Sequence, residues 1–178
     1  MARILREGTL TFIYGPPGTG KSRLALHIVR VTEELGFKTL VVATESGALL
    51  AFRSLGLNVN YAKTIDEMAK LVASGALSGS YVVVDTINSY YRGDPDYYSR
   101  RMLAAACSFM RISGGLALGQ ASEVEGRLGS PGYSIIGRYA HIVGVTSKAG
   151  EGKFYLKILK PEERLAAFRI EGDNIVWL

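Results

Sequence analysis

Apolar residues in the first part of the chain change their spacing twice, and each change indicates a new element. Residues 8–14 are rich in β-branched and aromatic side chains, which favours a strand, and the Gly- and Pro-containing segment 15–18 ends it. A helix is predicted next, because apolar residues recur at helical spacing: Leu24, Ile28, Val31 and Leu35. The apolar segment 38–44 predicts a second strand. The chain therefore opens with a strand, a helix and a strand, the unit that connects parallel strands.

The same kind of pattern continues through the middle of the chain. We expect a short helix at 47–55, a short strand at 58–63, a helix that opens with a capping-box pattern at 64–67, a strand at 81–85, a helix from about 94 to 111 and a strand at 115–118. Residues 81–85 are apolar at successive positions, which predicts a strand at the centre of the sheet with both faces covered. The Gly- and Ser-containing stretch from residue 121 to residue 132 predicts a mobile loop.

The last quarter of the chain has a different character. It contains short strand-like segments separated by Gly-containing turns, at 141–145, 154–159, 167–170 and 174–178. Such spacing predicts an antiparallel extension of the parallel sheet. The predicted fold class is therefore α/β, with a mostly parallel central sheet flanked by helices and with antiparallel strands at the C-terminal end. At 178 residues, the chain fits a single domain spanning 1–178.

Composition narrows the class of protein. Hydrophobic residues make up 48% of the chain and charged residues 21%, which excludes a disordered or fibrous protein. The apolar runs fall far short of the roughly 18 residues that cross a bilayer, and charges near the start interrupt any signal sequence. We therefore expect a cytoplasmic protein with no membrane segment. The single cysteine, Cys107, excludes an internal disulfide and is expected in the core. A formal charge of +5 is compatible with a polyanionic partner but is also common in proteins that bind no nucleic acid.

The most specific motif lies between the first strand and the first helix. Residues 15–22 read Gly-Pro-Pro-Gly-Thr-Gly-Lys-Ser and match the phosphate-binding pattern G-x-x-x-x-G-K-[ST] in full, in the strand-loop-helix context that the pattern requires. Backbone N–H groups of such a loop surround phosphates, and the helix N-terminus adds a positive dipole end. We expect Lys21 to reach the β- and γ-phosphates of ATP and Ser22 to bind Mg²⁺. The residues predicted to bind the nucleotide are Gly15, Pro16, Pro17, Gly18, Thr19, Gly20, Lys21, Ser22 and Arg23.

Three further polar residues follow predicted strands, where open α/β sheets bind their ligands. Asp85 ends an apolar strand and is predicted to hold Mg²⁺ together with Ser22. Glu45 follows the second strand, so it could orient or deprotonate the attacking water, although it could equally cap the next helix. Gln120 follows the strand at 115–118 and can both donate and accept, which suits a sensor of the γ-phosphate. The predicted catalytic set is therefore Lys21, Glu45 and Gln120.

These segments resemble one known family. The chain is similar to the archaeal RadB group of RecA-like recombinase paralogues in five segments, which occur in the same order. These segments are residues 14–22, Thr44-Glu45, 82–92 with Asp85 and Arg92, Gln120 and the closing residues 167–170. The resemblance covers nearly the whole chain and is most specific at 14–22 and 85–92. It implies a RecA-like P-loop NTPase core, with Glu45 activating water, Asp85 at the magnesium site and Gln120 coupling the nucleotide state to a DNA-binding loop. It also implies two loops that meet DNA, at about 91–98 and 121–132.

The sequence departs from this family in two places. The first core strand begins near the start of the chain, so we expect the N-terminal helical domain and linker motif of RadA-type recombinases to be absent, which puts filament formation in doubt. Where the family carries a Lys-His-Arg run that contacts ATP on a neighbouring subunit, this chain reads Lys-Pro-Glu from Lys160, so only Lys160 is predicted to keep that contact.

Aromatic and basic residues alternate between positions 90 and 101, which would suit single-stranded DNA, because stacking on an aromatic ring is worth about 1–3 kcal/mol per base. A helix with buried tyrosines and solvated arginines explains the pattern equally well. The residues predicted to contact DNA are Tyr91, Arg92, Arg100, Arg101 and Arg127.

The leading hypothesis is an ATPase that assists DNA repair or homologous recombination by binding DNA and a recombinase. Two alternatives remain open: a KaiC-like signalling ATPase that works through protein partners, and a nucleotide-binding interaction module with little turnover. Whether the chain forms a homo-oligomer is also open. Salt-dependent binding to single-stranded DNA separates the first two hypotheses, and steady-state ATP turnover separates both from the third.

Overall fold

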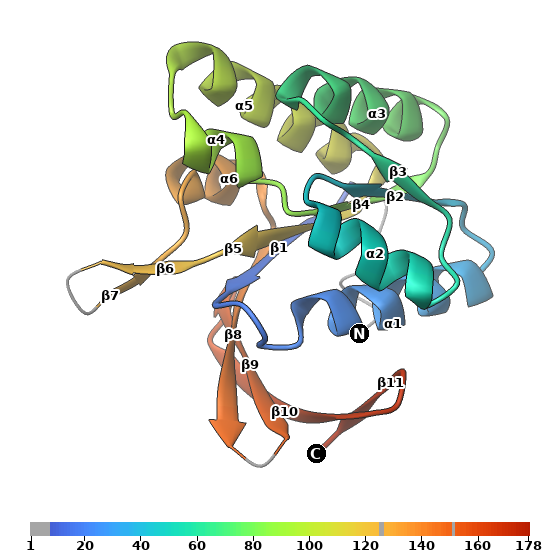
Figure 1. The fold of residues 1–178 in the computed structure, drawn as a ribbon, viewed down its shortest axis with the longest axis vertical. Helices are drawn as coiled ribbons and strands as arrows, with labels where there is room; N and C mark the ends of the chain where they lie inside the picture. Colours follow the sequence, from blue (N-terminus) through green and yellow to red (C-terminus); the bar gives the residue numbers. More distant parts are fainter. Residues whose placement is uncertain (1–7, 125–126, 151) are drawn as a thin grey trace.

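A nine-stranded sheet forms the centre of the protein in the computed structural model, which describes residues 8–124, 127–150 and 152–178 (Figure 1). The strands of this sheet are β1 (Leu10–Gly15), β2 (Thr39–Ala43), β3 (Val59–Tyr61), β4 (Tyr81–Asp85), β5 (Gly115–Gln120), β8 (Ile142–Gly150), β9 (Lys153–Lys160), β10 (Arg164–Glu171) and β11 (Asn174–Trp177). The helices are α1 (Lys21–Glu34), α2 (Ser46–Ser54), α3 (Ile65–Leu77), α4 (Ser89–Gly93), α5 (Tyr97–Ser113) and α6 (Tyr133–Tyr139).

The order of the strands is β11-β10-β9-β8-β1-β5-β4-β2-β3. The pairings between neighbouring strands from β8 to β3 are all parallel, whereas the pairings of β8 with β9, β9 with β10 and β10 with β11 are antiparallel. The predicted α/β class, the mostly parallel sheet and its C-terminal antiparallel extension are therefore confirmed. Because the strands are parallel, the carboxyl ends of β1, β2, β4 and β5 meet at one edge of the sheet.

Helices cover both faces of the sheet, and the alternation of side chains along β4 explains why. Val82 and Val84 lie in an apolar cluster with α3, α5 and α6, whereas Val83 lies in a second cluster with α1 and α2. All three side chains are fully buried, as expected for a strand with two covered faces. Cys107 of α5 belongs to the first cluster, and its burial raises the pKa of the thiol to about 12. It is a core residue, as the sequence predicts.

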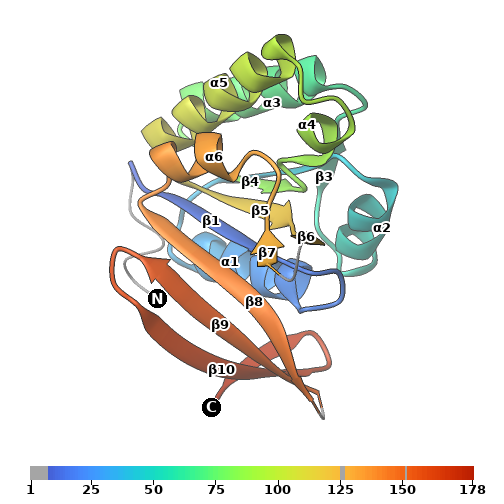
Figure 2. The same ribbon diagram turned by 90° about the vertical axis from the view of Figure 1, so that its left-hand side faces the viewer.

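The antiparallel strands bend away from the plane of the parallel strands and pass beneath α1 (Figure 2). Phe168 of β10 is fully buried in the cluster of α1, with its ring stacked on Phe154 of β9 at 5.4 Å between centroids. Truncating a buried phenylalanine to alanine typically costs about 3–5 kcal/mol. These strands therefore form a firmly packed wall next to the start of α1.

Two helix starts follow from local side-chain contacts. Thr64 caps α3 by accepting a hydrogen bond from the backbone N–H of Glu67 at 3.2 Å. The Glu67 carboxylate in turn accepts from the N–H of Lys63 at 2.6 Å, one residue before the cap. Asp96 caps α5 by accepting from the N–H of Ser99 at 2.6 Å. This cap explains why α5 begins at Tyr97 rather than at about residue 94.

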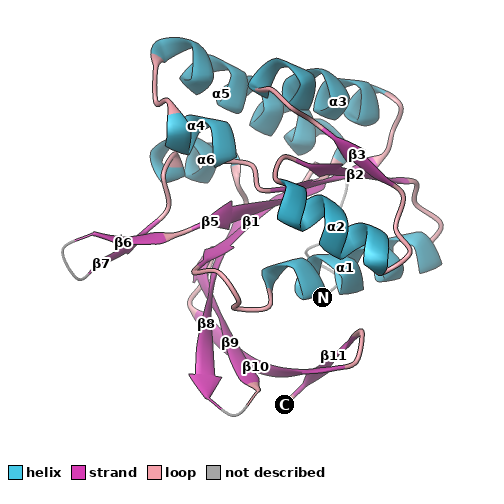
Figure 3. Ribbon diagram, viewed as in Figure 1, coloured by secondary structure: helices cyan, strands magenta, loops and turns pink. Residues whose placement is uncertain are grey.

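The largest difference from the predicted elements lies between residues 121 and 139. The segment predicted as a loop contains an antiparallel ribbon of β6 (Ser122–Val124) and β7 (Arg127–Gly129) that projects from the sheet, and the unpredicted helix α6 follows it (Figure 3). The sequence of α6 includes Ile135, Ile136 and Gly137, which have low helix propensity. Burial of Ile136 in the core stabilises this short helix instead. Within the described residues, no helix is long and apolar enough to cross a membrane.

Candidate functional site

The loop between β1 and α1 is held in place by small residues and by close backbone contacts. Gly20 precedes α1 with a φ of 83°, a left-handed conformation that favours glycine. A Cβ atom on Gly20 would lie 3.2 Å from the ring of Phe168 and 3.3 Å from Ile170. A Cβ atom on Gly15 would lie 2.4 Å from Oγ1 of Thr146. At Gly15 and Gly20 the backbone therefore lies so close to β8 and β10 that a side chain would not fit without a shift.

Lys21 bends back over this loop. Its Nζ donates hydrogen bonds to the carbonyl oxygens of Gly15, at 2.9 Å, and of Pro16, at 2.8 Å. Partial burial lowers the pKa of Lys21, and the nearby Asp85 and Glu45 carboxylates oppose this shift. The ammonium group thus lies at the mouth of the loop, within electrostatic reach of both predicted acidic residues.

Ser22 and Asp85 meet directly. The Ser22 hydroxyl donates to Oδ2 of Asp85 at 2.8 Å, and the Thr86 hydroxyl donates to Oδ1 at 3.1 Å. Asp85 is only 4% exposed, and its burial raises the pKa of the carboxyl, opposed by the two hydrogen bonds and by Lys21. A buried carboxylate of this kind gains stability from a cation beside it.

The hydroxyl and the carboxylate fit a magnesium ion. Mg²⁺ is usually held by one or two protein oxygens, with phosphate and water oxygens completing its shell. Within residues 8–124, 127–150 and 152–178, no group of three or more His, Cys, Asp or Glu side chains gathers as a metal site. Ser22 and Asp85 would therefore hold the ion together with phosphate oxygens of a nucleotide.

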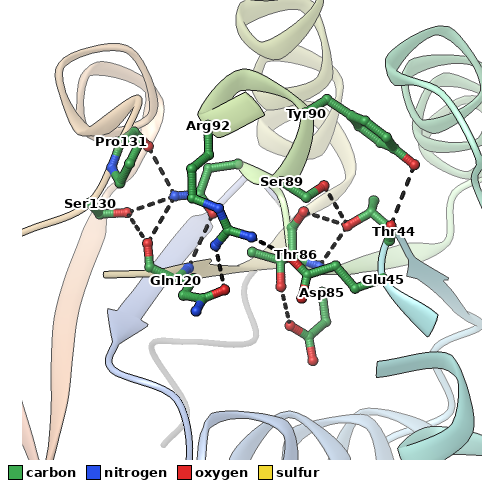
Figure 4. Close-up of polar contacts among 11 residues, drawn as sticks. Thr44, Glu45, Asp85, Thr86, Ser89, Tyr90, Arg92, Gln120, Ser130 and Pro131 are labelled. Atoms are coloured by element: carbon green, nitrogen blue, oxygen red, sulfur yellow. Dashed lines mark hydrogen bonds and ion pairs between the residues drawn. The ribbon is translucent and has the colours of Figure 1, made fainter. Parts of the chain in front are cut away.

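Thr44, which the sequence analysis did not single out as a site residue, organises the ends of β2 and β4 (Figure 4). Its buried hydroxyl donates to the carbonyl oxygen of Thr86 at 2.7 Å and accepts from the N–H of Thr86 at 2.9 Å. It also accepts from the hydroxyl of Ser89 at 2.8 Å. These hydrogen bonds connect Thr44, the residue before Glu45, to Thr86, the residue after Asp85. They therefore fix the backbone positions of the two acidic residues relative to each other.

Glu45 and Gln120 are joined by one arginine. Arg92 of α4 donates through Nη2 to Oε1 of Glu45 at 2.9 Å and through Nη1 to Oε1 of Gln120 (Figure 4). The structure therefore brings two of the predicted catalytic residues together through a residue that the sequence analysis assigned to DNA.

Asn88, another residue that the sequence analysis did not single out, fixes the base of the β6–β7 ribbon. Its fully buried amide donates to Ser130 Oγ at 3.1 Å and to the carbonyl oxygens of Gln120 and Pro131, each at 3.0 Å. Its Oδ1 accepts from the N–H of Gln120 at 3.1 Å. Gln120 lies before the ribbon and Ser130 after it. The amide therefore clamps both ends of the ribbon to the segment after β4.

A pocket of about 280 Å³ lies beside the loop. It is lined by Gly18, Gly20, Lys21, Ser22, Arg23, Phe154 and Ile170. Arg23 is also paired with Asp173, in the turn between β10 and β11. The pocket thus joins the phosphate-binding loop to an apolar wall, a combination that suits a phosphorylated ligand with a flat apolar group.

Two residues of β8 contribute to the loop although no motif marks them. The Thr146 hydroxyl shares a hydrogen bond of 2.7 Å with the hydroxyl of Thr19, which fixes the middle of the loop. Nζ of Lys148 lies 3.7 Å from the position that a Cβ atom on Gly18 would occupy. Both residues lie more than a hundred positions from the loop, so only the pairing of β8 with β1 brings them there.

The residues predicted to contact DNA lie in different surroundings, and their contact with DNA stays a prediction. Arg100 and Arg101 are exposed on α5, and Arg101 lies over the ring of Tyr97 at 5.7 Å. Tyr91 is half-buried and packs against the first apolar cluster. Arg92 is the residue bound to Glu45 and Gln120. Arg127 begins β7, but its side chain lies outside the described part of the structure.

Lys160, predicted to contact ATP on a neighbouring subunit, has partners within its own chain. Its Nζ donates to the carbonyl oxygen of Ala140 at 2.6 Å and to that of Gly137 at 3.3 Å, at the C-terminal end of α6. A cation is favourable at a helix C-terminus. The contact to a neighbouring subunit stays a prediction.

Comparison with known proteins gives sequence matches of moderate identity. No protein-family model matches the chain. The chain is 27% identical over 129 residues to a DNA repair and recombination protein RadB of Methanosphaera stadtmanae, a match that covers 61% of this chain and 56% of that protein. It is 31% identical over 104 residues to proteins of the same description from two strains of Halobacterium salinarum, covering 49% of this chain and 44% of each.

The chain spans about half the length of the curated relatives it matches. The matches nevertheless agree with the resemblance carried by the motifs, and the order and direction of the strands agree with a RecA-like core. By sequence and by fold, the chain is a relative of the archaeal RadB proteins with a RecA-like α/β architecture.

Proposed function

We propose that the chain binds ATP with Mg²⁺ at residues 15–23 and hydrolyses it. The observation that carries this proposal is the convergence of the Gly-rich loop, the Lys21 ammonium and the Ser22–Asp85 pair at the carboxyl edge of the parallel strands. Each supplies what a triphosphate needs: backbone N–H groups, a positive charge and oxygen ligands for the ion.

Each residue has a distinct task in this proposal. The loop and the N-terminus of α1 bind the phosphates, and Lys21 leaves the loop carbonyls to bind the β- and γ-phosphates. Arg23 and the apolar wall of the pocket hold the nucleoside part. Mg²⁺, when bound, neutralises charge that develops on the phosphate oxygens. Glu45 orients and activates the attacking water, and Gln120 donates to the γ-phosphate.

We further propose that the chain acts in DNA repair and recombination, binding single-stranded DNA and a recombinase. The similarity to RadB proteins, which are described as DNA repair and recombination proteins, supports this role, and the exposed arginines of α5 are compatible with it. Gln120 also stands where the β6–β7 ribbon leaves the sheet, so a change at the γ-phosphate would reach the ribbon directly. Neither a KaiC-like signalling role nor a module without turnover is supported by an observation of this kind.

The test compares the wild-type chain with Lys21→Ala and Glu45→Gln in nucleotide binding and steady-state ATP turnover. Loss of a charge-assisted hydrogen bond costs about 1.5–3 kcal/mol, so Lys21→Ala should weaken nucleotide binding about 10- to 150-fold. Glu45→Gln should bind with wild-type affinity but turn over much more slowly. Equal and negligible turnover in all three proteins would favour the interaction module.

A further inference from the structure

The position of Arg92 follows from the order of the strands. In the sheet, β4 lies between β5 and β2, so Gln120 at the end of β5 and Glu45 after β2 stand on either side of the end of β4. Helix α4 begins four residues after Asp85 ends β4 and carries Arg92. A side chain from this helix therefore starts between Glu45 and Gln120, and Arg92 reaches both of them (Figure 4).

The chemistry of the guanidinium group decides how its two partners are turned. Arginine has only donors, so each partner must present an acceptor to it. Gln120 uses its carbonyl oxygen, Oε1, and its Nε2 donors are therefore directed away from Arg92. Glu45 accepts from Arg92 through Oε1, and its Oε2 can accept from a water molecule.

We propose that Arg92 is a positioning residue for the hydrolysis proposed above. Arg92 holds Glu45 and Gln120 so that Oε2 of Glu45 accepts from the attacking water and Nε2 of Gln120 donates to the γ-phosphate. The proposal rests on the proposed ATPase function. Without Arg92, the Gln120 amide could turn over and present an acceptor to the negatively charged phosphate. A lysine carries a single point charge on a flexible stem and cannot fix two acceptors as a planar guanidinium does.

The ion pair itself adds little to stability. Arg92 and Glu45 are both 36% exposed, and pairs that reach solvent contribute only about 0–1 kcal/mol. Loss of Arg92 should therefore leave the fold almost unchanged and act on the position of the two catalytic groups. This difference separates positioning from a purely structural role.

The experiment measures ATP turnover, nucleotide affinity and thermal stability for wild type, Arg92→Ala, Arg92→Lys, Glu45→Gln and Arg53→Ala. Arg53 is an exposed arginine of α2, the helix that follows Glu45, and serves as the matched control. A well-placed general base contributes about 10²–10⁴-fold to a rate, so its misplacement in Arg92→Ala should lower kcat about 10- to 100-fold. Nucleotide affinity and Tm should stay near wild type, and Arg92→Lys should recover only a small part of kcat.

The outcomes separate this proposal from the proposed function. If Glu45→Gln loses turnover while Arg92→Ala keeps the wild-type kcat, the positioning role is wrong and the ATPase function stands. If Arg92→Ala weakens affinity and stability as much as kcat, or if Arg92→Lys behaves as wild type, Arg92 does not act by orienting its partners. Absence of turnover in wild type, or wild-type turnover in Glu45→Gln, overturns the proposed function and the positioning role together.

Discussion

Gly20→Ala tests the contact between the phosphate-binding loop and the antiparallel strands. Gly20 has a φ of 83°, and a left-handed conformation costs an L-residue about 1–2 kcal/mol. The new Cβ atom would also lie 3.2 Å from Phe168 and 3.3 Å from Ile170. Phe168 is fully buried between Phe154 and Trp177, so it has little room to move. Such overpacking typically costs a further 1–3 kcal/mol, or roughly 2–5 kcal/mol in all.

Gly36→Ala is the matched control at the other end of α1. Gly36 has a φ of 84°, but among the described residues no heavy atom beyond its chain neighbours lies within 4 Å of the position of its Cβ. Both substitutions restrict the unfolded chain equally, by about 0.4–1 kcal/mol, so this effect cancels in the comparison. Gly36→Ala should therefore cost only about 1–2 kcal/mol, the conformational part alone.

The assay is thermal unfolding followed by circular dichroism, together with nucleotide titration. In a chain of this length 1 kcal/mol shifts Tm by about 2–4 °C, so Tm should fall by roughly 4–20 °C in Gly20→Ala and by about 2–8 °C in Gly36→Ala. Nucleotide affinity should fall only in Gly20→Ala. Equal losses of Tm in the two variants, with nucleotide binding intact in both, would show that the contact with Phe168 and Ile170 does not shape the loop.

Two further predictions concern the buried carboxylate and the exposed arginines. Burial raises the pKa of Asp85 above its ordinary value, so the nucleotide-free chain should lose stability as the pH rises from about 3.9 through the folded-state pKa. Asp85→Asn should remove this loss and raise Tm in the absence of ligand. The same variant should no longer be stabilised by ATP with Mg²⁺ in thermal unfolding scans. A wild-type response to the nucleotide in Asp85→Asn would contradict the assigned magnesium site. Each of Arg100→Ala and Arg101→Ala should reduce the slope of log affinity for single-stranded DNA against log salt by about 0.7, measured by fluorescence anisotropy with Arg53→Ala as the control. Slopes equal to that of wild type would remove both arginines from the DNA surface.

Much of the fold follows from local patterns in the sequence. The apolar segment that ends in Asp85 forms a buried strand, and the phosphate-binding pattern lies between a strand and a helix as predicted. Parallel strands bring their carboxyl ends together, and this rule alone places Glu45, Asp85 and Gln120 at one edge. The C-terminal strands β8, β9 and β10 are longer than predicted, because their solvent-facing residues are polar and hide the ends of each strand.

Contacts between distant residues could not be predicted in the same way. Asn88 lies in a segment without periodicity, and its role depends on Gln120, Ser130 and Pro131, which are 32 to 43 positions away. Arg92 lies among aromatic and basic residues, a local pattern that is typical of a DNA-binding surface. Its contacts with Glu45 and Gln120 result from strand order, which the sequence does not display.

The central claim is that residues 15–22 surround a triphosphate whose charge is balanced by Lys21 and by an ion at Ser22 and Asp85. The most direct measurement is a calorimetric titration of the wild-type chain with ATP and Mg²⁺, repeated without the metal and with Lys21→Ala. We expect saturable binding of one nucleotide per chain that weakens when either the metal or the lysine is removed. Absence of heat and of saturation at millimolar nucleotide in the wild-type chain would contradict the account.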